Sequence, residues 1–266
     1  MSNGDQLRGW SSRGAGDVAV VIPAKNERDR IAATVAAAKT ISDVVLVVDD
    51  GSTDGTAEAA REAGALVVAH IKNRGKAAAM TTGARVVAGL DERDQLDTPR
   101  HLLFLDADLE ESAKEGAALV EPVRAHQADV TVGVLPPQKR KGGGFGFVVR
   151  LAKKGVRQLT GFEATQPLSG QRCMTRGAFQ AVQPLARGWG VETAMLIDLL
   201  RSGFCVQEVE VDGHHRVTGR DLHSQIHRLR QYADVAVALA VRRARSRGER
   251  ATGLLHAPRA RAGSSD

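Results

Sequence analysis

The sequence predicts an α/β fold in which a mostly parallel sheet is flanked by helices. Short β-branched apolar runs alternate with Ala-rich helical stretches through the first half of the chain. This alternation is typical of strands joined by right-handed helical crossovers. The chain has 266 residues, of which 42% are apolar, so it is long enough to bury the core of one large domain. We therefore expect a single domain followed by a long C-terminal helix.

Five strands and four helices are expected in the first half. The runs that predict the strands are Val18–Ile22, Val44–Val48, Leu66–Ala69, His101–Leu105 and Val130–Val134. The helical stretches between them are Glu27–Lys39, Asp54–Ala63, Lys76 to about Leu90, and Ser112–Ala125. Ser52 and Thr53 are expected to cap the second helix, because hydroxyl oxygens accept hydrogen bonds from the free N–H groups of a first turn.

The second half is less regular. A loop rich in Pro, Gly and Lys covers 136–146, and a helix is expected near Phe147–Thr160. A helix after Gly190, a strand near Cys205–Val211 and a long helix from Leu222 to about Arg247 follow. We expect a disordered N-terminus (1–16), one folded domain (17–220), the C-terminal helix (221–248) and a disordered basic tail (249–266).

Composition narrows the class of protein. No apolar run reaches the ~20 residues that a membrane-spanning helix needs, and Ala233–Val241 comes closest. Residues 1–17 lack the apolar segment of a signal peptide, so a cytoplasmic protein is expected. Cys173 and Cys205 are expected to be reduced core residues. Much of the net charge of +6 lies in the C-terminal arginines, but only 3% of residues are aromatic, so no nucleic-acid partner is expected.

Polar clusters follow three of the predicted strands. Ligands of open parallel sheets collect beyond the carboxyl ends of the strands, so these clusters are expected to form one site. The clusters are Pro23-Ala24-Lys25-Asn26-Glu27, Asp49-Asp50-Gly51-Ser52 and Asp106-Ala107-Asp108.

The third cluster contains two carboxylates separated by one residue. On an extended backbone Asp106 and Asp108 point to the same face while Ala107 turns away. Converged carboxylates suit Mg²⁺ or Mn²⁺, which complete their coordination with water and phosphate oxygens. An isolated pair of this kind is more often two solvated acids in a turn, but the neighbouring clusters favour a metal that holds a diphosphate.

Four motifs together resemble family 2 glycosyltransferases, which have a nucleotide-sugar-binding GT-A fold. They are VVIPAKNE (20–27), VVDDGSTDGT (47–56), NRGKAAAM (73–80) and LDADLE (105–110). The resemblance implies a nucleotide-sugar half (17–135) and an acceptor half (136–220). It also implies that the donor contacts the following residues. They are Pro23, Ala24, Asn26, Glu27, Asp49, Asp50, Gly51, Ser52, Lys76, Asp106, Ala107, Asp108 and Gly170.

Several of these residues have a simpler interpretation that stays open. Glu27 is also an acid favoured at a helix N-terminus, and Asp50 is also an ordinary turn residue. Asp49 and Asp50 resemble the acids that contact base and ribose, and we expect at least one of them to do so. Lys76 stands at a helix N-terminus, where a cation is unfavourable unless an anion such as a diphosphate lies nearby. A surface lysine is the alternative.

The second half resembles the glucosyl-3-phosphoglycerate synthases of actinobacteria. The matching segments are Gly-Gly-Gly (142–144), Gln-Pro-Leu-Ser-Gly-Gln (166–171), Gly-Trp-Gly-Val-Glu-Thr (188–193) and His-His-Arg (214–216). This resemblance implies His215 as a third metal ligand beside Asp106 and Asp108, with His214 as second choice. It places Glu192 near the acceptor, as a general base or an orienting acid. The predicted catalytic residues are therefore Asp108, Glu192 and Lys76.

The acceptor residues depart from that pattern. Phe145-Gly146-Phe147 follow the glycine triplet, and Val217-Thr218-Gly219 replace a segment that carries an Asn, which calls phosphoglycerate as acceptor into question. The expected activity is metal-dependent transfer of a sugar, glucose from a UDP donor, to a hydroxyl or phosphate group of the acceptor, which is a small phosphorylated molecule or a lipid phosphate. Retention and inversion of the anomeric centre both stay open, as does a homodimer.

The alternative activity is a polyprenyl-phosphate glycosyltransferase that uses UDP-glucose or GDP-mannose at the inner face of the plasma membrane. It rests on Phe145–Gly161, a basic amphipathic stretch that can lie on an anionic membrane. A helix that faces the core with a basic outer side explains the same pattern. A non-catalytic nucleotide-binding or membrane-associated protein ranks below both.

Overall fold

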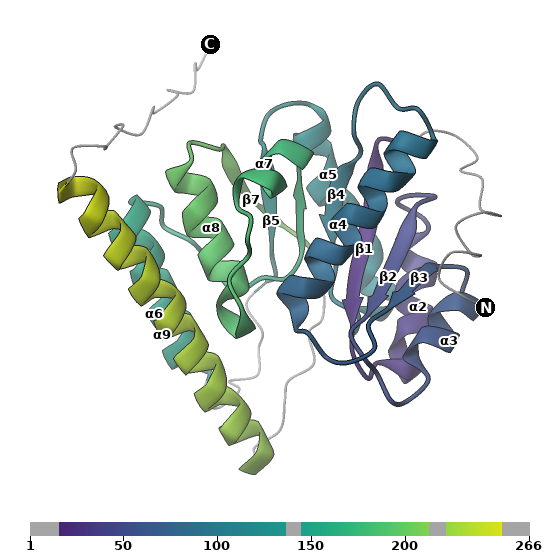
Figure 1. Cartoon of the computed structure of the whole chain (residues 1–266), viewed down its shortest axis with the longest axis horizontal. Coiled ribbons are helices and arrows are strands. Elements are labelled where there is room, and N and C mark those ends of the chain that lie inside the picture. The colour runs from purple at the N-terminus through teal and green to yellow at the C-terminus, as the bar shows by residue number, and fades with distance from the viewer. Residues whose placement is uncertain (1–15, 137–144, 213–221, 252–266) are drawn as a thin grey trace.

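A computed structural model describes residues 16–136, 145–212 and 222–251. Its centre is a seven-stranded sheet with the order β3-β2-β1-β4-β6-β5-β7 (Figure 1). The strands are β1 Val18–Ala24, β2 Val45–Asp49, β3 Leu66–Ala69, β4 His101–Phe104, β5 Val130–Val134, β6 Arg172–Met174 and β7 Val206–Glu210. All neighbouring pairs are parallel except β4–β6 and β5–β6, so the predicted mostly parallel sheet is confirmed.

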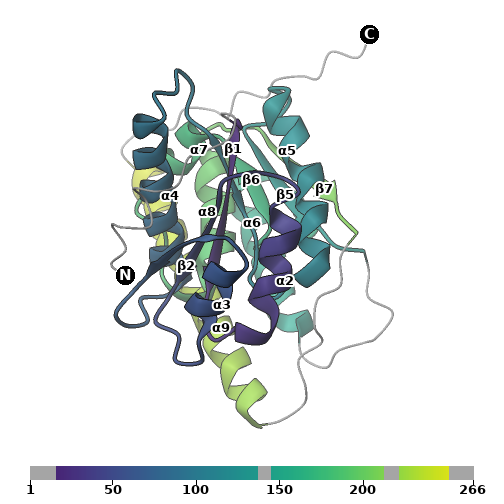
Figure 2. The ribbon, with the colours of Figure 1, turned by 90° about the vertical axis from the view of Figure 1, so that its right-hand side faces the viewer.

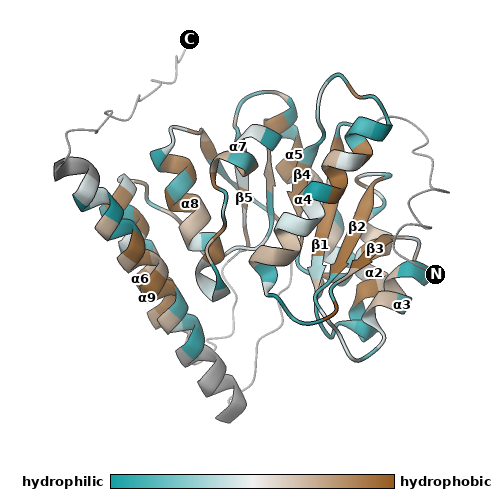
Figure 3. Cartoon of the chain, in the orientation of Figure 1, coloured by the Kyte–Doolittle hydropathy of each residue, from teal (hydrophilic) through white to brown (hydrophobic). Residues whose placement is uncertain are grey.

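Helices cover both faces of the sheet. They are α2 Arg28–Ala38, α3 Thr56–Glu62, α4 Lys76–Arg93, α5 Ala117–Arg124, α6 Phe145–Thr160, α7 Arg176–Ala181, α8 Val191–Arg201 and α9 Leu222–Ala251, with 3₁₀ turns η1 Glu110–Gly116 and η2 Gly188–Gly190. Figure 2 shows α4 on one side of the strands and α2 and α5 on the other. Alternation along β1 explains this layering, because Val20 and Ile22 pack toward α2 while Ala19 and Val21 pack toward α4. The central strands β1 and β2 are accordingly mostly apolar (Figure 3), whereas the edge strand β7 contains Gln207, Glu208 and Glu210.

The structure corrects several predicted boundaries. Pro23 and Ala24 belong to β1, and Ala24 pairs with Asp49 in the sheet. Ser52 and Thr53 do not cap α3, whose N-cap is Gly55 at φ 86°; the carboxylate of Asp54 accepts a hydrogen bond from the backbone N–H of Thr56 instead (3.0 Å).

Two further differences concern helices. The stretch 112–125 divides into η1 and α5, and α9 continues to Ala251. The short elements β6 and α7 were not predicted, because three and six residues are too few to show a period. The predicted disorder of 1–15 and 252–266 lies outside the described residues.

A third apolar cluster joins α6, α8 and α9. Val148, Ala152 and Val156 of α6 are buried there against Leu196 of α8 and Leu239 of α9. The apolar side of α6 therefore faces the core, which supports the second interpretation of this helix. In the described part of the chain, no helix is both long enough and apolar enough to cross a membrane. The expectation of two core cysteines is half wrong, since Cys173 is buried but Cys205 at the start of a surface strand is exposed.

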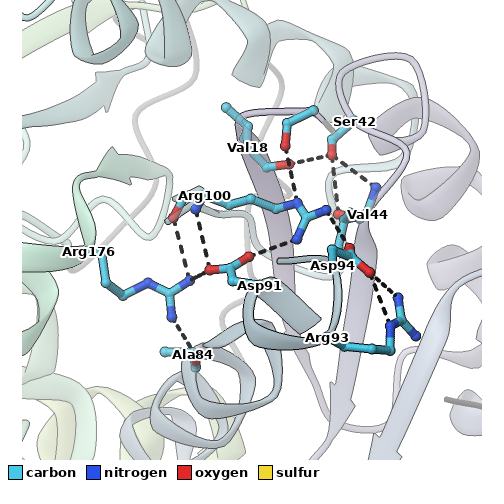
Figure 4. Close-up of polar contacts among 10 residues, drawn as sticks. Val18, Ser42, Val44, Ala84, Asp91, Arg93, Asp94, Arg100 and Arg176 are labelled. Carbon is cyan, nitrogen blue, oxygen red and sulfur yellow. Dashed lines mark hydrogen bonds and ion pairs between the residues drawn. The ribbon is translucent and has the colours of Figure 1, made fainter. Parts of the chain in front are cut away.

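An ion network lies at the edge of the sheet where β4 begins, among the polar contacts of Figure 4. Arg100 is fully buried and donates to Asp91 and Asp94, at 2.7 Å in each case. Arg176 of α7 donates to the other oxygen of Asp91 (2.8 Å), and Arg100 also reaches the Gly16 carbonyl (3.1 Å). Asp91 is therefore shared by two guanidinium groups that are largely removed from water.

Replacing Asp91 by alanine is expected to lower the free energy of unfolding by about 3 kcal/mol, because it leaves buried guanidinium charge without its partner. Urea unfolding measures this value. Asp97→Ala, in the exposed loop between α4 and β4, is the matched control and should change stability by less than about 0.5 kcal/mol. Equal stabilities for the two variants would show that the network adds nothing to the fold.

Candidate active site

The loops after β1 and β2 are fastened to each other. The Ser52 hydroxyl accepts from the backbone N–H of Asn26 (2.9 Å), and the Asn26 side chain accepts from the backbone N–H of Thr53 (3.0 Å). One residue further on, the Thr56 hydroxyl accepts from the backbone N–H of Glu27 (2.9 Å). Asn26 has φ 55°, a left-handed conformation that Asn tolerates better than most residues. Asn26 and Ser52 thus build the rim of the predicted donor site.

Asp50 fixes the segment that leads into α4. Its carboxylate accepts from the backbone N–H groups of Arg74 (2.8 Å) and Gly75 (2.7 Å) and contacts Nδ1 of His70 (2.7 Å). His70, which the sequence analysis missed, also contacts the Thr82 hydroxyl (3.0 Å). The side chain of Asp50 is therefore engaged by segments far away in the sequence, which ordinary turn chemistry does not explain, and its contact with the nucleotide stays a prediction.

Asp49 and Gly51 lie on either side of Asp50 in the sequence. Asp49 is nearly buried and accepts from the backbone N–H of Ser52 through one carboxylate oxygen (3.0 Å). Gly51 has φ 72°, and a Cβ at this position would come within 2.7 Å of the backbone of Lys72 and Asn73. Glycine is required here because two loops pass each other at backbone distance.

Lys76, the first residue of α4, contacts two other predicted site residues. Its ammonium lies 2.6 Å from Oδ1 of Asp106 and 2.9 Å from Oε1 of Glu192. Burial lowers the pKa of Lys76, but the charges and hydrogen bonds of Asp106 and Glu192 outweigh burial and leave this pKa raised. Glu192 is almost buried in the first turn of α8. Two protein carboxylates thus lie beside Lys76, where an anion such as a diphosphate was expected, and the contact of Lys76 with a donor stays a prediction.

Asp106 and Asp108 lie in a turn, since β4 ends at Phe104. The predicted extended backbone is therefore wrong for these residues, although Ala107 is buried and the two acids are partly exposed. The turn is held by Thr34 of α2, whose hydroxyl donates to the Ala107 carbonyl (2.9 Å). Thr34 was not predicted, because its contact crosses from a different element.

Glu27 faces Arg30 one turn along α2. Its carboxylate accepts from Nε (2.9 Å) and from the terminal nitrogen of Arg30 (2.6 Å). Burial raises the pKa of Glu27, Arg30 partly opposes this, and the negative charge of Asp108 adds to the increase. Glu27 is the N-cap of α2 but makes no capping bond with its side chain. Glu27 and Asp108 therefore belong to one acidic rim.

Gly170 and Arg172 connect the second half of the chain to this rim. A Cβ on Gly170 would overlap both carboxylate oxygens of Asp106. Arg172, buried to 1% exposure, donates to the carbonyls of Ser169 (2.5 Å) and Glu192 (3.5 Å). Burial lowers the pKa of Arg172, and the charges of Glu192 and Asp106 oppose this. Arg172 was not predicted, because an arginine in a short strand gives no signal of burial.

Oxygen donors for a hard cation come from Asp106 and Asp108, and the missing side chain of Gly170 lets the Asp106 carboxylate lie directly against the backbone there. Mg²⁺ commonly binds through one or two carboxylates and completes its coordination with water and substrate phosphates, so these residues fit. Among the described residues there is no group of three or more His, Cys, Asp or Glu side chains that could hold a metal. His214 and His215 lie outside the described residues.

The fold and the acidic rim place the chain in the GT-A class. Residues 19–180 match the model of glycosyl transferase family 2, and the chain belongs to this family of glycosyltransferases. Glycosyltransferase AglJ of Haloferax volcanii is 28% identical over 219 residues, 77% of this chain and 65% of that protein. The undecaprenyl-phosphate 4-deoxy-4-formamido-L-arabinose transferase of Edwardsiella ictaluri is 30% identical over 210 residues, 74% of this chain and 59% of that protein. The chain thus spans less than two thirds of either relative.

Solved structures show the same fold. Glucosyl-3-phosphoglycerate synthase of Mycobacterium tuberculosis, in complex with Mn²⁺, uridine diphosphate and phosphoglyceric acid, superposes with a TM-score of 0.67 at 24% identity. The superposition covers 85% of this chain and 78% of that protein. The GT-A expectation for the fold is therefore confirmed.

Proposed function

We propose that this site transfers a sugar, glucose from UDP-glucose, to a phosphorylated acceptor. The observation that carries the proposal is the Lys76 bridge between Asp106 of the donor half and Glu192 of the acceptor half. In this proposal Asp106 binds the leaving diphosphate and Glu192 contacts the acceptor, so the bridge keeps the two substrates next to each other. The solved synthase with Mn²⁺ and uridine diphosphate supports the choice of donor.

On the donor side, Asp106 and Asp108 would hold Mg²⁺ or Mn²⁺, with His215 as the proposed third ligand. The bound cation would supply neutralisation of the charge on the leaving diphosphate. Lys76 adds a second positive charge there once its ammonium exchanges a protein carboxylate for a phosphate oxygen. Asp49 and Glu27, at the ends of neighbouring strands, are proposed to contact the nucleoside.

On the acceptor side, Glu192 is proposed to accept a hydrogen bond from the acceptor or to take its proton. The carboxylate is held by the Lys76 ammonium, and the backbone that carries it, in the first turn of α8, is held by Arg172 through the Glu192 backbone carbonyl. A carboxylate held in this way is preorganised, as acid–base and positioning roles need.

A lipid phosphate is the second candidate acceptor. It is favoured by the relative from Edwardsiella ictaluri, whose name describes transfer involving undecaprenyl phosphate. Both acceptor classes present a phosphate, so they share the donor machinery. Cytoplasmic location and a homodimer also stay predictions.

Calorimetric titration of UDP, GDP and ADP, each with Mn²⁺ and again with EDTA, tests the donor assignment. We expect UDP to bind most tightly and only with the metal. Preference for GDP would assign a different donor and strengthen the lipid-phosphate candidate. No metal-dependent binding of any of the three nucleotides would overturn the proposal.

Replacing Gly170 by alanine is expected to weaken Mn²⁺-dependent UDP binding by about tenfold or more, because overpacking costs about 1–3 kcal/mol and the new methyl group displaces the Asp106 carboxylate. Gly177→Ala is the control, since no atom lies within 4 Å of its added Cβ. The same calorimetric titration measures both variants. Unchanged UDP affinity in Gly170→Ala would show that Gly170 is not part of the donor site.

A further inference from the structure

The outer side of α6 is strongly basic. The helix contains Arg150, Lys153, Lys154 and Arg157 and no acidic residue, and all four cations are exposed. Arg157 pairs with Glu163 (3.0 Å), and Arg150 lies over the ring of Phe147 at 4.5 Å. In the described part of the chain no ion pair is found for the two lysines. Their charge is therefore free to attract an anionic partner.

The outer side of α9 is apolar and lies next to these cations. Arg243 donates to Gln158 of α6 (2.8 Å), and the lack of a side chain at Gly155 of α6 lets Leu239 of α9 pack directly against it. Figure 1 shows the two helices running along one edge of the molecule. The exposed apolar residues of α9 lie on one side at helical spacing, namely Ala233, Val237, Ala240, Val241 and Ala244.

We propose that this surface, the exposed residues of α6 and α9 named above together with Phe147, docks on an anionic lipid membrane. Phe147 is 70% exposed and Val237 62% exposed, and both helices also carry exposed cations, among them Arg245 and Arg247 of α9. Apolar side chains flanked by lysine and arginine are the combination that anionic lipid interfaces bind. The inference concerns an interaction beyond glycosyl transfer and does not depend on it.

Two other partners fit less well. In a two-fold dimer through this surface, Lys153 and Lys154 would approach like charges of the second copy, because such an interface is self-complementary. A nucleic acid would match the charge, but stacking on successive bases needs a series of aromatic side chains, and among the residues of α6 and α9 whose burial is described only Phe147 and Tyr232 are exposed aromatics.

The position of the surface relative to the site is also informative. Helix α8, which begins with Val191 and Glu192, packs on both α6 and α9. The loop before it is fastened to α9, because the carboxylate of Asp234 accepts from the backbone N–H of Trp189 (3.0 Å). A membrane bound at α6 and α9 would therefore lie beside the acceptor half of the site.

The test is co-sedimentation of the full chain with vesicles of phosphatidylcholine, with and without phosphatidylglycerol. We expect binding only to the anionic vesicles. Lys153→Glu/Lys154→Glu should weaken it about tenfold or more, since each cation near an anionic surface adds substantially to binding. Lys39→Glu/Lys114→Glu, on exposed positions of α2 and η1, makes the same charge change elsewhere and should bind within about twofold of the parent chain.

A second variant tests the apolar part of the surface without altering charge. Val237→Gln/Val241→Gln should lose most of the binding that persists at high salt, because screening leaves the apolar contribution. Both side chains are exposed, and a thermal unfolding midpoint equal to that of the parent chain verifies the fold. Equal binding of the parent chain and the α6 double variant would overturn the proposal. Binding to an RNA oligonucleotide that the α6 substitutions abolish, without vesicle binding, would also overturn it.

Discussion

Replacing Asp106 by asparagine is expected to reduce sugar transfer by roughly 10³-fold, because the residue is the proposed anchor of the donor diphosphate and its cation. The substitution removes a charge while keeping nearly the same volume beside Gly170. It also turns the ion pair with the Lys76 ammonium (2.6 Å) into, at most, a hydrogen bond to an uncharged amide oxygen. Release of UDP from UDP-glucose, measured at saturating Mn²⁺, gives the rate. Metal-dependent UDP binding should be lost together with the activity.

Glu111→Gln is the matched control for Asp106→Asn. Glu111 is an exposed acid a few residues further along, in η1, and its substitution should leave the rate within about twofold of the parent enzyme. The Asp106–Lys76 pair is partly exposed, so Asp106→Asn should lower the free energy of unfolding by no more than about 1 kcal/mol. Undiminished transfer by Asp106→Asn at saturating metal would show that the donor is bound elsewhere.

The first half of the fold could be predicted because its information is local. Each strand from β1 to β5 is a short apolar run, and each is followed by a helical stretch. The hydrophobic periodicity and the turn residues between the runs are therefore enough to predict these elements. The prediction that Lys76 needs an anion rested on a similarly local fact, its place at a helix N-terminus. The structure supplies that anion from Asp106 and Glu192, which lie 30 and 116 residues further along the chain.

What could not be predicted is mostly contact between distant segments. Arg172 lies in a three-residue strand between β4 and β5, and only the assembled sheet buries it. The role of Asp50 as an anchor depends on the backbone of Arg74 and Gly75, which no spacing within the chain reveals. Thr34 was missed for the same reason, since its partner carbonyl is 73 residues away.

Helix α6 illustrates a different limit. Its sequence shows a strongly amphipathic helix, but the pattern does not say what covers the apolar side. The cover is Leu239 and Val235 of α9 together with α8, so the apolar residues of α6 face protein. The exposed side of α9 then becomes the apolar surface of this edge, and this could be seen only after the helices were placed.

Replacing Glu192 by glutamine is expected to lower turnover by roughly 10²- to 10³-fold while leaving UDP affinity nearly unchanged. The carboxylate stands in the acceptor half, so it contributes to the reaction without contributing to nucleotide binding. This outcome differs from that of Asp106→Asn, which should lose both turnover and UDP binding. Turnover and calorimetric titration of UDP on the same preparations separate the two residues. Glu163→Gln, an exposed acid after α6, is the control and should keep full turnover.

A double substitution distinguishes what Glu192 does. If its carboxylate serves the acceptor, Glu192→Gln should reduce turnover further in a Lys76→Met background, because the two residues then act on different groups. If Glu192 only holds the Lys76 ammonium (2.9 Å), the double variant should be no slower than Lys76→Met alone. We expect the further reduction, since Asp106 also holds Lys76 and Glu192 is not needed for that purpose. Full turnover by the single Glu192→Gln variant would show that the Glu192 carboxylate has no part in the reaction.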